Sequence, residues 1–253
     1  MGWYDCTKIF PEDGDHSIPE NKDSNLCWAA VTSNLVHWWL DQNKDNIDQY
    51  GKYTNGPKVY TDALHSEVFD YFKNRFTNEG SFIESGLNWF FFNKYPSGNS
   101  NMASLNMLGR EHKGFFTDVV GENGFFNTNL YRPTYGSNLN EDLKKAFTQG
   151  EAIGLSILTT GGKGGHALTV WGAHFNENEV VDKLYVCENN DTFNFKDEEN
   201  LRPTPMEPGK LCRQGIYEHK VKQLENGRWA LEAGAYEVYT MIVDKVVYLN
   251  DGH

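Results

Sequence analysis

The chain has 253 residues, of which 14% are aromatic, so it can bury a large core as one domain or as two closely packed lobes. Its 23 Lys and Arg against 35 Asp and Glu give a net charge of −12, and we do not expect a surface that binds nucleic-acid phosphates. No apolar run approaches the roughly 18 residues that a membrane-spanning helix requires, and residues 1–25 lack the basic start and apolar stretch of a secretion signal.

The first half of the chain has the periodicity of helices. Apolar residues three or four positions apart predict a helix that Asn25 caps and that runs to about Asn43. A second helix is predicted from Thr61. Ser81 and Glu84 form the pattern of a capping box at the start of a third.

The second half of the chain has the periodicity of strands. Residues 95–137 are predicted to form loops, and one more helix follows, with Asn138 at its start and Gly150 at its end. The predicted strands cover 153–157, 166–175, 180–187, 216–224, 229–232 and 238–249, with a meander as their simplest topology. The pattern therefore predicts a single α+β domain over 1–253, with a mainly helical lobe over about 1–125 and a mainly β lobe over 126–253.

Several common reaction classes lack their signatures in this sequence. The zinc-hydrolase pattern H-E-x-x-H, the G-x-S-x-G elbow and the phosphate-binding P-loop are all missing. The four cysteines, at positions 6, 27, 187 and 212, form no C-x-x-C pair and no Cys/His group typical of zinc. We therefore expect no metal site.

One pair of residues has the placement of a nucleophile and its base. Cys27 opens the first predicted helix, where free N–H groups and the helix dipole favour a thiolate, and His166 opens a strand in the other lobe. A cysteine in an apolar helix is more commonly a packed core residue, and histidines are frequent. From the pattern alone both interpretations stay open.

Four segments of the chain resemble a known family. They are Gly2–Lys8, Asn25–Cys27, His37–Asp45 and His166–Ala173, and they look like the streptococcal immunoglobulin G endopeptidases of the IdeS/Mac type. Those enzymes are cysteine proteases of the papain clan. The resemblance covers 2–9, 26–50, 63–76 and 144–190 in the family's order, and it fades over 95–137 and beyond residue 192.

The resemblance implies roles for five residues. Cys27 would be the nucleophile, His166 its general base, and Lys8 a charged contributor to the oxyanion hole. Glu188 and Asn190 match two aspartates of the family, and we expect Glu188 to hold the imidazole with Asn190 in support. The fold would be papain-like, with the active site in the cleft between a helical lobe and an antiparallel β lobe, and without any cofactor.

The resemblance also implies a substrate and a location. It predicts a secreted or cell-surface bacterial endopeptidase acting on immunoglobulin, most simply at an IgG-type hinge, in a chain from which the signal has been removed. Two alternatives remain. The chain could be a catalytically impaired relative that binds immunoglobulin or another host protein, or a related cysteine protease with a different protein substrate. Specificity would then depend on the loops where the resemblance fades.

Overall fold

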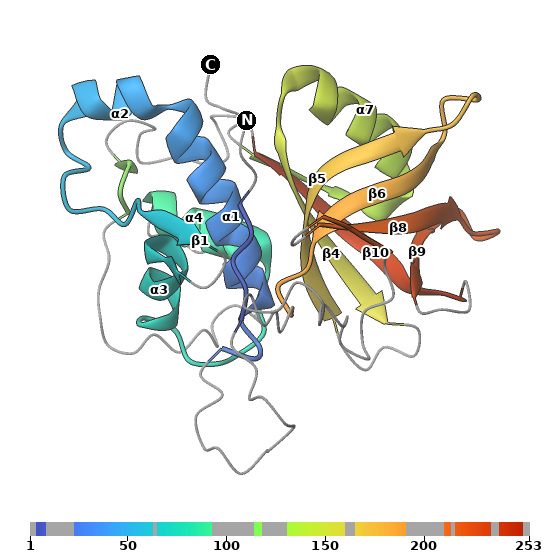
Figure 1. Cartoon of the computed structure of the whole chain (residues 1–253), viewed down its shortest axis with the longest axis horizontal. Helices are drawn as coiled ribbons and strands as arrows, with labels where there is room; N and C mark the ends of the chain where they lie inside the picture. Colours follow the sequence, from blue (N-terminus) through green and yellow to red (C-terminus); the bar gives the residue numbers. More distant parts are fainter. Residues whose placement is uncertain are drawn as a thin grey trace, which may run out of the picture.

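The computed structural model describes residues 4–8, 23–62, 65–92, 114–117, 131–159, 165–190, 210–213, 216–233 and 238–249. Figure 1 shows an α+β arrangement, with α2, α3, α4 and β1 on one side, the strands of the large sheet together with α7 on the other, and α1 between them. The helices are α1 (Cys27–Gln42), α2 (Lys44–Tyr50), α3 (Glu67–Lys73), α4 (Ile83–Phe92) and α7 (Leu139–Gln149), with a 3-10 turn at Gly136–Asn138.

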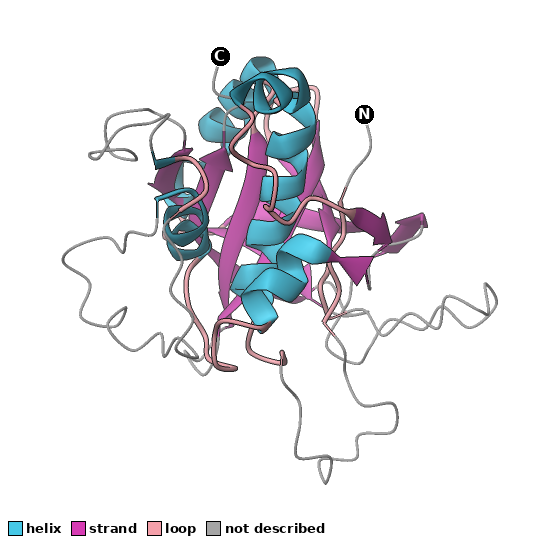
Figure 2. Cartoon of the chain, turned by 90° about the vertical axis from the view of Figure 1, so that its left-hand side faces the viewer, coloured by secondary structure: helices cyan, strands magenta, loops and turns pink. Residues whose placement is uncertain are grey.

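Two sheets are present in the described part of the chain. The small one pairs β1 (Tyr60–Asp62) with β2 (His65–Ser66). The large one contains β3 (Tyr131–Tyr135), β4 (Ala152–Thr159), β5 (Gly165–Phe175), β6 (Val181–Cys187), β7 (Lys210–Arg213), β8 (Ile216–Gln223), β9 (Trp229–Ala233) and β10 (Val238–Leu249). Figure 2 views the molecule from its helical side, with the helices in front of these strands.

Six antiparallel strands of the large sheet close on themselves. The pairs run β4 to β5, β5 to β6, β6 to β8, β8 to β9, β9 to β10, and β10 back to β4. The predicted meander is correct for β4, β5 and β6, and again for β8, β9 and β10. Closure depends on β10, whose pairing shifts register between Val243 and Lys245, and on β9, which bonds to strands on both sides. A closed barrel leaves few free strand edges, and it gives α1 a firm surface to pack against.

Helix α1 is buried on nearly every face because it lies between the barrel and an aromatic cluster. Trp28 meets the rings of Phe72 and Phe76 edge to face, with centroids 5.7 and 5.4 Å apart. Thr32 lies so close to Gly86 of α4 that a Cβ there would be 2.4 Å from the Thr32 hydroxyl oxygen. On its other side α1 packs on β4 and β5. This packing fixes both the depth and the angle of its first turn.

The structure corrects several predicted helix starts. The first helix is confirmed, but its N-cap is Leu26, without a side-chain bond. The Asn25 backbone N–H instead donates to Asn78 Oδ1 at 2.6 Å. The second helix begins at Glu67, where the Ser66 hydroxyl accepts from a backbone N–H, because Tyr60–Asp62 forms β1.

Two further caps and one loop also differ from the prediction. Glu84 bonds to Lys245 of β10 and so makes no capping box, and Asn138 precedes α7 without a side-chain cap bond, although Gly150 ends that helix in the left-handed conformation as predicted. Part of the predicted loop region is strand β3, which pairs with β10. Residues 95–113 and 118–130 of that region lie outside the described residues.

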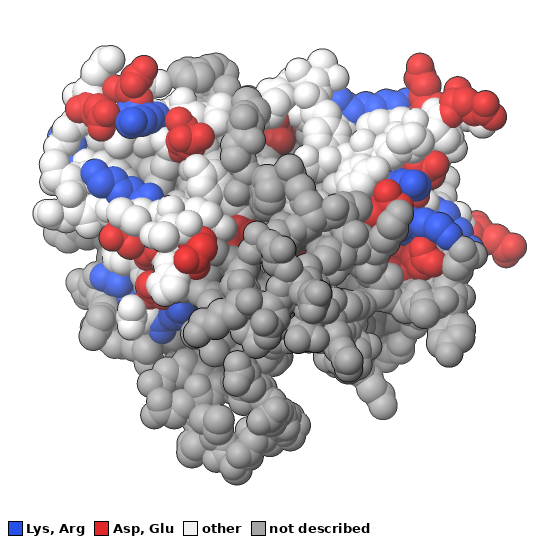
Figure 3. Space-filling view, viewed as in Figure 1, with Lys and Arg blue, Asp and Glu red and all other residues white. Residues whose placement is uncertain are grey.

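Charges of both signs are interspersed over the described part of the face drawn in Figure 3. Among the helices that the structure describes, none has the length and apolar character needed to span a membrane.

Candidate active site

Cys27 is the first residue of α1 and carries a free, half-buried thiol. Asp23 accepts a hydrogen bond from the Leu26 backbone N–H at 2.8 Å, which turns the chain into the helix. The first turn of α1 contains no acidic residue. Its unpaired N–H groups and the helix dipole therefore present a positive field to the sulfur, which favours the thiolate.

His166 is the second residue of β5 and faces Cys27 from the barrel. Its Nε2 donates to Glu188 Oε1, and the imidazole also hydrogen-bonds the Cys27 sulfur. Because Nε2 is taken by the carboxylate, the sulfur bond falls to Nδ1. The contact of α1 with β5 is what joins the helix start to the strand start. The predicted pair, 139 positions apart in the sequence, is thus a hydrogen-bonded pair in the structure.

The electrostatics of this pair favour a thiolate and an imidazolium. Burial opposes a charge on the Cys27 sulfur, but the hydrogen bond and charge of His166, the Lys8 ammonium and the Ala167 backbone N–H together lower the pKa of this thiol. Burial likewise opposes the charge on His166, yet the Glu188 carboxylate and the bond to Cys27 raise its pKa to about 10. Both shifts point to charge separation at neutral pH.

Glu188 and Asn190 lie in the turn that follows β6. The strand ends at Cys187, so the two residues do not share a strand face as the period-two pattern predicts. Glu188 is 5% exposed, and its Oε1 accepts from His166 and from the Asn190 backbone N–H at 3.1 Å. The buried Asn190 Oδ1 has no hydrogen-bond partner within the described residues. Of the two candidates, only Glu188 contacts the imidazole.

Lys8 is 3% exposed and approaches the site from the N-terminal segment 4–8. Its Nζ donates to the Ser24 carbonyl at 2.7 Å, and its backbone N–H donates to the Asn189 carbonyl at 2.8 Å. Ser24 is three residues before Cys27, so the ammonium is held beside the start of α1. An ammonium has three donors, and one that is buried close to the thiolate can turn toward an anion formed there.

The structure adds residues that the sequence pattern did not select. The Ala167 N–H bonds to the Cys27 sulfur. Asn34 accepts from the Cys6 backbone N–H at 2.7 Å and donates to the Thr169 hydroxyl at 2.9 Å, which joins segment 4–8, α1 and β5. A polar residue on an apolar helix, two turns after Cys27, was the available signal for Asn34. The N–H of Ala167 leaves no signal in the sequence.

The other described cysteines differ from Cys27 in their burial. Cys6 is fully buried, and burial raises the pKa of its thiol far above the ordinary value. Cys187 is also free and buried, and Cys212 lies in β7 with its side chain outside the described set. Within the described residues, no group of three or more His, Cys, Asp or Glu side chains is arranged to hold a metal ion.

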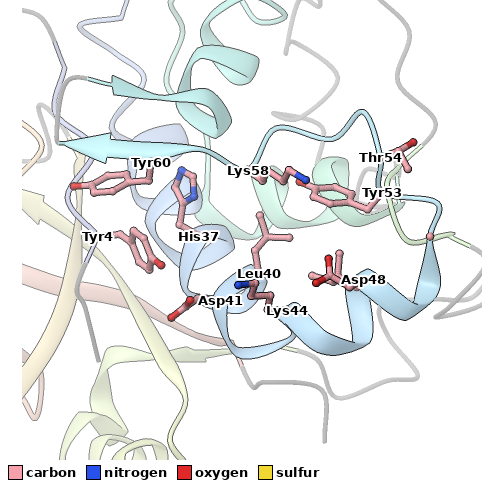
Figure 4. A pocket seen from close by; sticks show the side chains of 12 residues that line it. Tyr4, His37, Leu40, Asp41, Lys44, Asp48, Tyr53, Thr54, Lys58 and Tyr60 are labelled. Carbon is pink, nitrogen blue, oxygen red and sulfur yellow. The ribbon is translucent and has the colours of Figure 1, made fainter.

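A separate cavity of about 470 Å³ opens toward the far end of α1 (Figure 4). Aromatic rings and charges of both signs line it: Tyr4, His37, Tyr53, Tyr60, Asp41, Asp48, Lys44 and Lys58. Burial lowers the pKa of His37 to about 4, so this ring is neutral at physiological pH. Asp41 is about 14 residues beyond Cys27 on α1, or ~21 Å along the helix axis, so this cavity is not where the thiol reacts.

Comparisons with known proteins agree with the resemblance described above. The sequence model of the family described as Mac 1 matches residues 1–207. A protein named IgM protease, from Streptococcus suis strain P1/7, is 29% identical over 189 residues. That alignment covers 67% of this chain but only 16% of the relative, so the chain spans a small part of the relative's length. Because the family match includes more than three quarters of the sequence and all five predicted site residues, the chain belongs to the Mac 1 family.

Proposed function

We propose that this chain is a cysteine endopeptidase whose substrate is immunoglobulin. The observation that carries the proposal is the line from the Cys27 sulfur through His166 to Glu188, in which a thiol at a helix start is bonded to an imidazole that a carboxylate holds. A buried carboxylate that orients a histidine beside a nucleophile is an arrangement that supports acyl transfer.

The proposed reaction proceeds in two half-reactions. The Cys27 thiolate attacks the scissile carbonyl carbon, a C–S bond forms, and the carbonyl electron pair moves to oxygen. The oxyanion then collapses, the C–N bond breaks, and the His166 imidazolium gives its proton to the leaving amine. In the second half-reaction His166 takes a proton from water, whose oxygen attacks the thioester and releases the new carboxyl terminus along with the thiolate. Glu188 stabilises the imidazolium in each half.

Lys8 supplies the charge for the oxyanion in this proposal. Replacing it with alanine is expected to lower kcat by roughly 10²- to 10³-fold with little change in KM, because a donor aimed at a developing oxyanion acts in the transition state. Steady-state cleavage kinetics measure this. Lys245→Ala is the matched control, since Lys245 is a half-buried lysine that pairs with Glu84 of α4 rather than with a site residue, and its loss should affect stability rather than turnover. A Lys8→Ala protein with normal kcat would leave the lysine as a structural residue.

The substrate class comes from the relatives. The IgM protease of Streptococcus suis is named for an immunoglobulin substrate, and the resemblance noted in the sequence points to IgG. We propose that this chain forms one papain-like domain that meets immunoglobulin outside the cell, where antibodies are found. The antibody class is to be decided by experiment, because the relative is named for IgM whereas the resemblance in the sequence points to IgG.

Incubation with purified IgG, IgM and IgA, each with and without iodoacetamide pretreatment, tests the proposal. Electrophoresis should show discrete fragments of at least one class, and alkylation should prevent their formation. Cleavage that survives alkylation would contradict the cysteine mechanism. Cleavage of other proteins but of no antibody would contradict the substrate, and binding of immunoglobulin without any cleavage would favour the binding-module alternative.

A further inference from the structure

We propose that Asn189 is a positioning residue for two groups beside the Cys27 thiolate. Its side chain holds Ala167, whose backbone N–H donates to the thiolate, and its main-chain carbonyl holds Lys8. This rests on the proposed function, because it concerns the groups that would surround the reacting thiolate. Asn189 lies between the two predicted site residues Glu188 and Asn190, but its own hydrogen bonds go to Ala167 and Lys8. It is 1% exposed.

The side chain of Asn189 completes the sheet beside the catalytic histidine. The last pair of the β5 and β6 ladder next to the site is Thr169 with Cys187. If the register continued, Ala167 would face Asn189, but β6 has already ended there. The Asn189 side-chain amide donates to the Ala167 carbonyl at 2.7 Å and so takes the place of the missing ladder bond. On the other edge of β5, Ala167 is paired with Ser156 of β4.

Ala167 matters because its own N–H bonds to the Cys27 sulfur and adds to the larger effects of His166 and Lys8 in lowering the pKa of this thiol. A donor to the sulfur stabilises the thiolate only while the distance from donor to sulfur stays short and the angle at the hydrogen stays close to linear. Ala167 is held by β4 on one side and by Asn189 on the other, so loss of the amide frees one edge of the strand start. His166 is the preceding residue and would move with it.

The main chain of Asn189 ties Lys8 to the same point. Its carbonyl accepts from the Lys8 N–H at 2.8 Å, so segment 4–8 meets the barrel next to the turn that carries Glu188. The backbone N–H of Cys6, two residues before Lys8, donates to the side chain of Asn34. Asn189 therefore connects Ala167, Lys8 and the turn that carries Glu188.

The amide nitrogen of Asn189 is the part of this side chain that makes its hydrogen bond to Ala167. Its Oδ1 is buried and lacks a hydrogen-bond partner among the described residues. The NH₂ group is the only part of this side chain that can donate to the Ala167 carbonyl, and the geometry uses it.

The test compares variants by the pH at which Cys27 becomes reactive. Asn189→Leu keeps the size and branching of the side chain but removes the donor. Cys27 is alkylated with iodoacetamide for a fixed time over pH 4–9, and peptide mapping gives the labelled fraction at each pH. The midpoint of this pH profile is obtained without any substrate. We expect this midpoint to rise by about 0.3 pH unit, roughly a twofold loss of thiolate at fixed pH, with kcat reduced more than KM is raised.

Other charged groups around the thiolate are unchanged by this substitution. They are the titratable groups His166 on β5, Lys8 in segment 4–8, Glu188 after β6, and His219 on β8, which interacts electrostatically with Glu188. A shift of the midpoint therefore reports on the geometry of the donors rather than on a lost charge.

Asn140→Leu is the matched control. The Asn140 Oδ1 accepts from the Val181 N–H at 2.7 Å, so this amide holds the opposite end of β6. It should lower the melting temperature and leave the Cys27 midpoint unchanged. If Asn189→Leu does not fold, Asn189→Ser, whose hydroxyl is too short to reach the Ala167 carbonyl, carries the same expected shift.

A folded Asn189 variant that melts earlier but keeps the parental midpoint and kcat would overturn the proposal and leave a purely structural asparagine. Failure of the proposed function gives a different result. In that case the parent protein cleaves no immunoglobulin, while the alkylation midpoints of parent and variants still differ as expected.

Discussion

Replacing Cys27 with alanine is expected to abolish immunoglobulin cleavage, with kcat lowered by roughly 10⁴-fold or more. Without the sulfur no acyl-enzyme can form, and His166 is left without the group it activates. Fragment formation over time, followed by electrophoresis, measures the loss. Circular dichroism should show an intact fold, because Cys27 is half-buried at the start of α1 and makes little of the core.

The matched control for this substitution is Cys6→Ala. Cys6 is also a free cysteine, but burial raises the pKa of its thiol and keeps it protonated, so turnover should stay at the parental level. Alkylation of the parent at pH 6 should label Cys27 well before Cys6 and Cys187, because only Cys27 combines a lowered pKa with partial exposure. Persistent cleavage by Cys27→Ala would place the chemistry elsewhere in the molecule.

Glu188→Gln is expected to lower kcat by roughly 10³- to 10⁴-fold. The Glu188 carboxylate is the main influence that raises the pKa of His166 to about 10 despite burial, and a neutral amide cannot replace that charge. The direction of the change in the pH profile follows from this pKa. A His166 with a lower pKa loses its proton at lower pH, so the alkaline limit of activity should move down from about pH 10. A pH profile of kcat from pH 5 to pH 10.5 measures both changes.

Asp182→Asn is the matched control for Glu188→Gln. Asp182 also bonds to a histidine, His174, on the same pair of strands, at 2.6 Å, but that pair is exposed. Its loss should leave the pH profile unchanged, since an exposed pair contributes little. Asn190→Ala should have a smaller effect than Glu188→Gln, because Asn190 does not bond to the imidazole. The reverse order of the two variants would assign the orienting role to Asn190 and contradict the geometry.

The sequence by itself determined the elements with strong local signals. The apolar spacing of α1 arises from helix geometry, and the left-handed Gly150 ends α7, so both were predictable from neighbouring residues. The alternation in β4 and the many β-branched and aromatic residues of β10 likewise predicted strands at the observed places. These signals depend on contacts within a few residues.

Helix caps were decided by tertiary contacts instead. Ser81 and Glu84 have the spacing of a capping box, yet Glu84 bonds to Lys245, 161 positions away in the sequence. Asn25 has the chemistry of a cap but binds Asn78. A polar side chain takes whichever partner the packed structure brings near, and the sequence does not say which long-range partner that is.

Barrel closure also required the tertiary structure. Strand β9 joins β8 to β10, and β3 adds to β10 from a region that the composition predicted as loops. Closure is a property of the whole sheet, because each strand must meet a partner on both edges. No five-residue pattern encodes it.

The candidate site also combines features that the sequence predicted with features that only the tertiary structure decided. The resemblance selected Lys8, Cys27, His166, Glu188 and Asn190, and helix and strand periods placed Cys27 and His166 at the starts of their elements. Only the folded chain decided that Glu188 rather than Asn190 contacts His166, and that Asn189 bonds to both Ala167 and Lys8. The physical reason is that β6 ends at Cys187: from there the turn, rather than the alternation of a strand, aims each side chain.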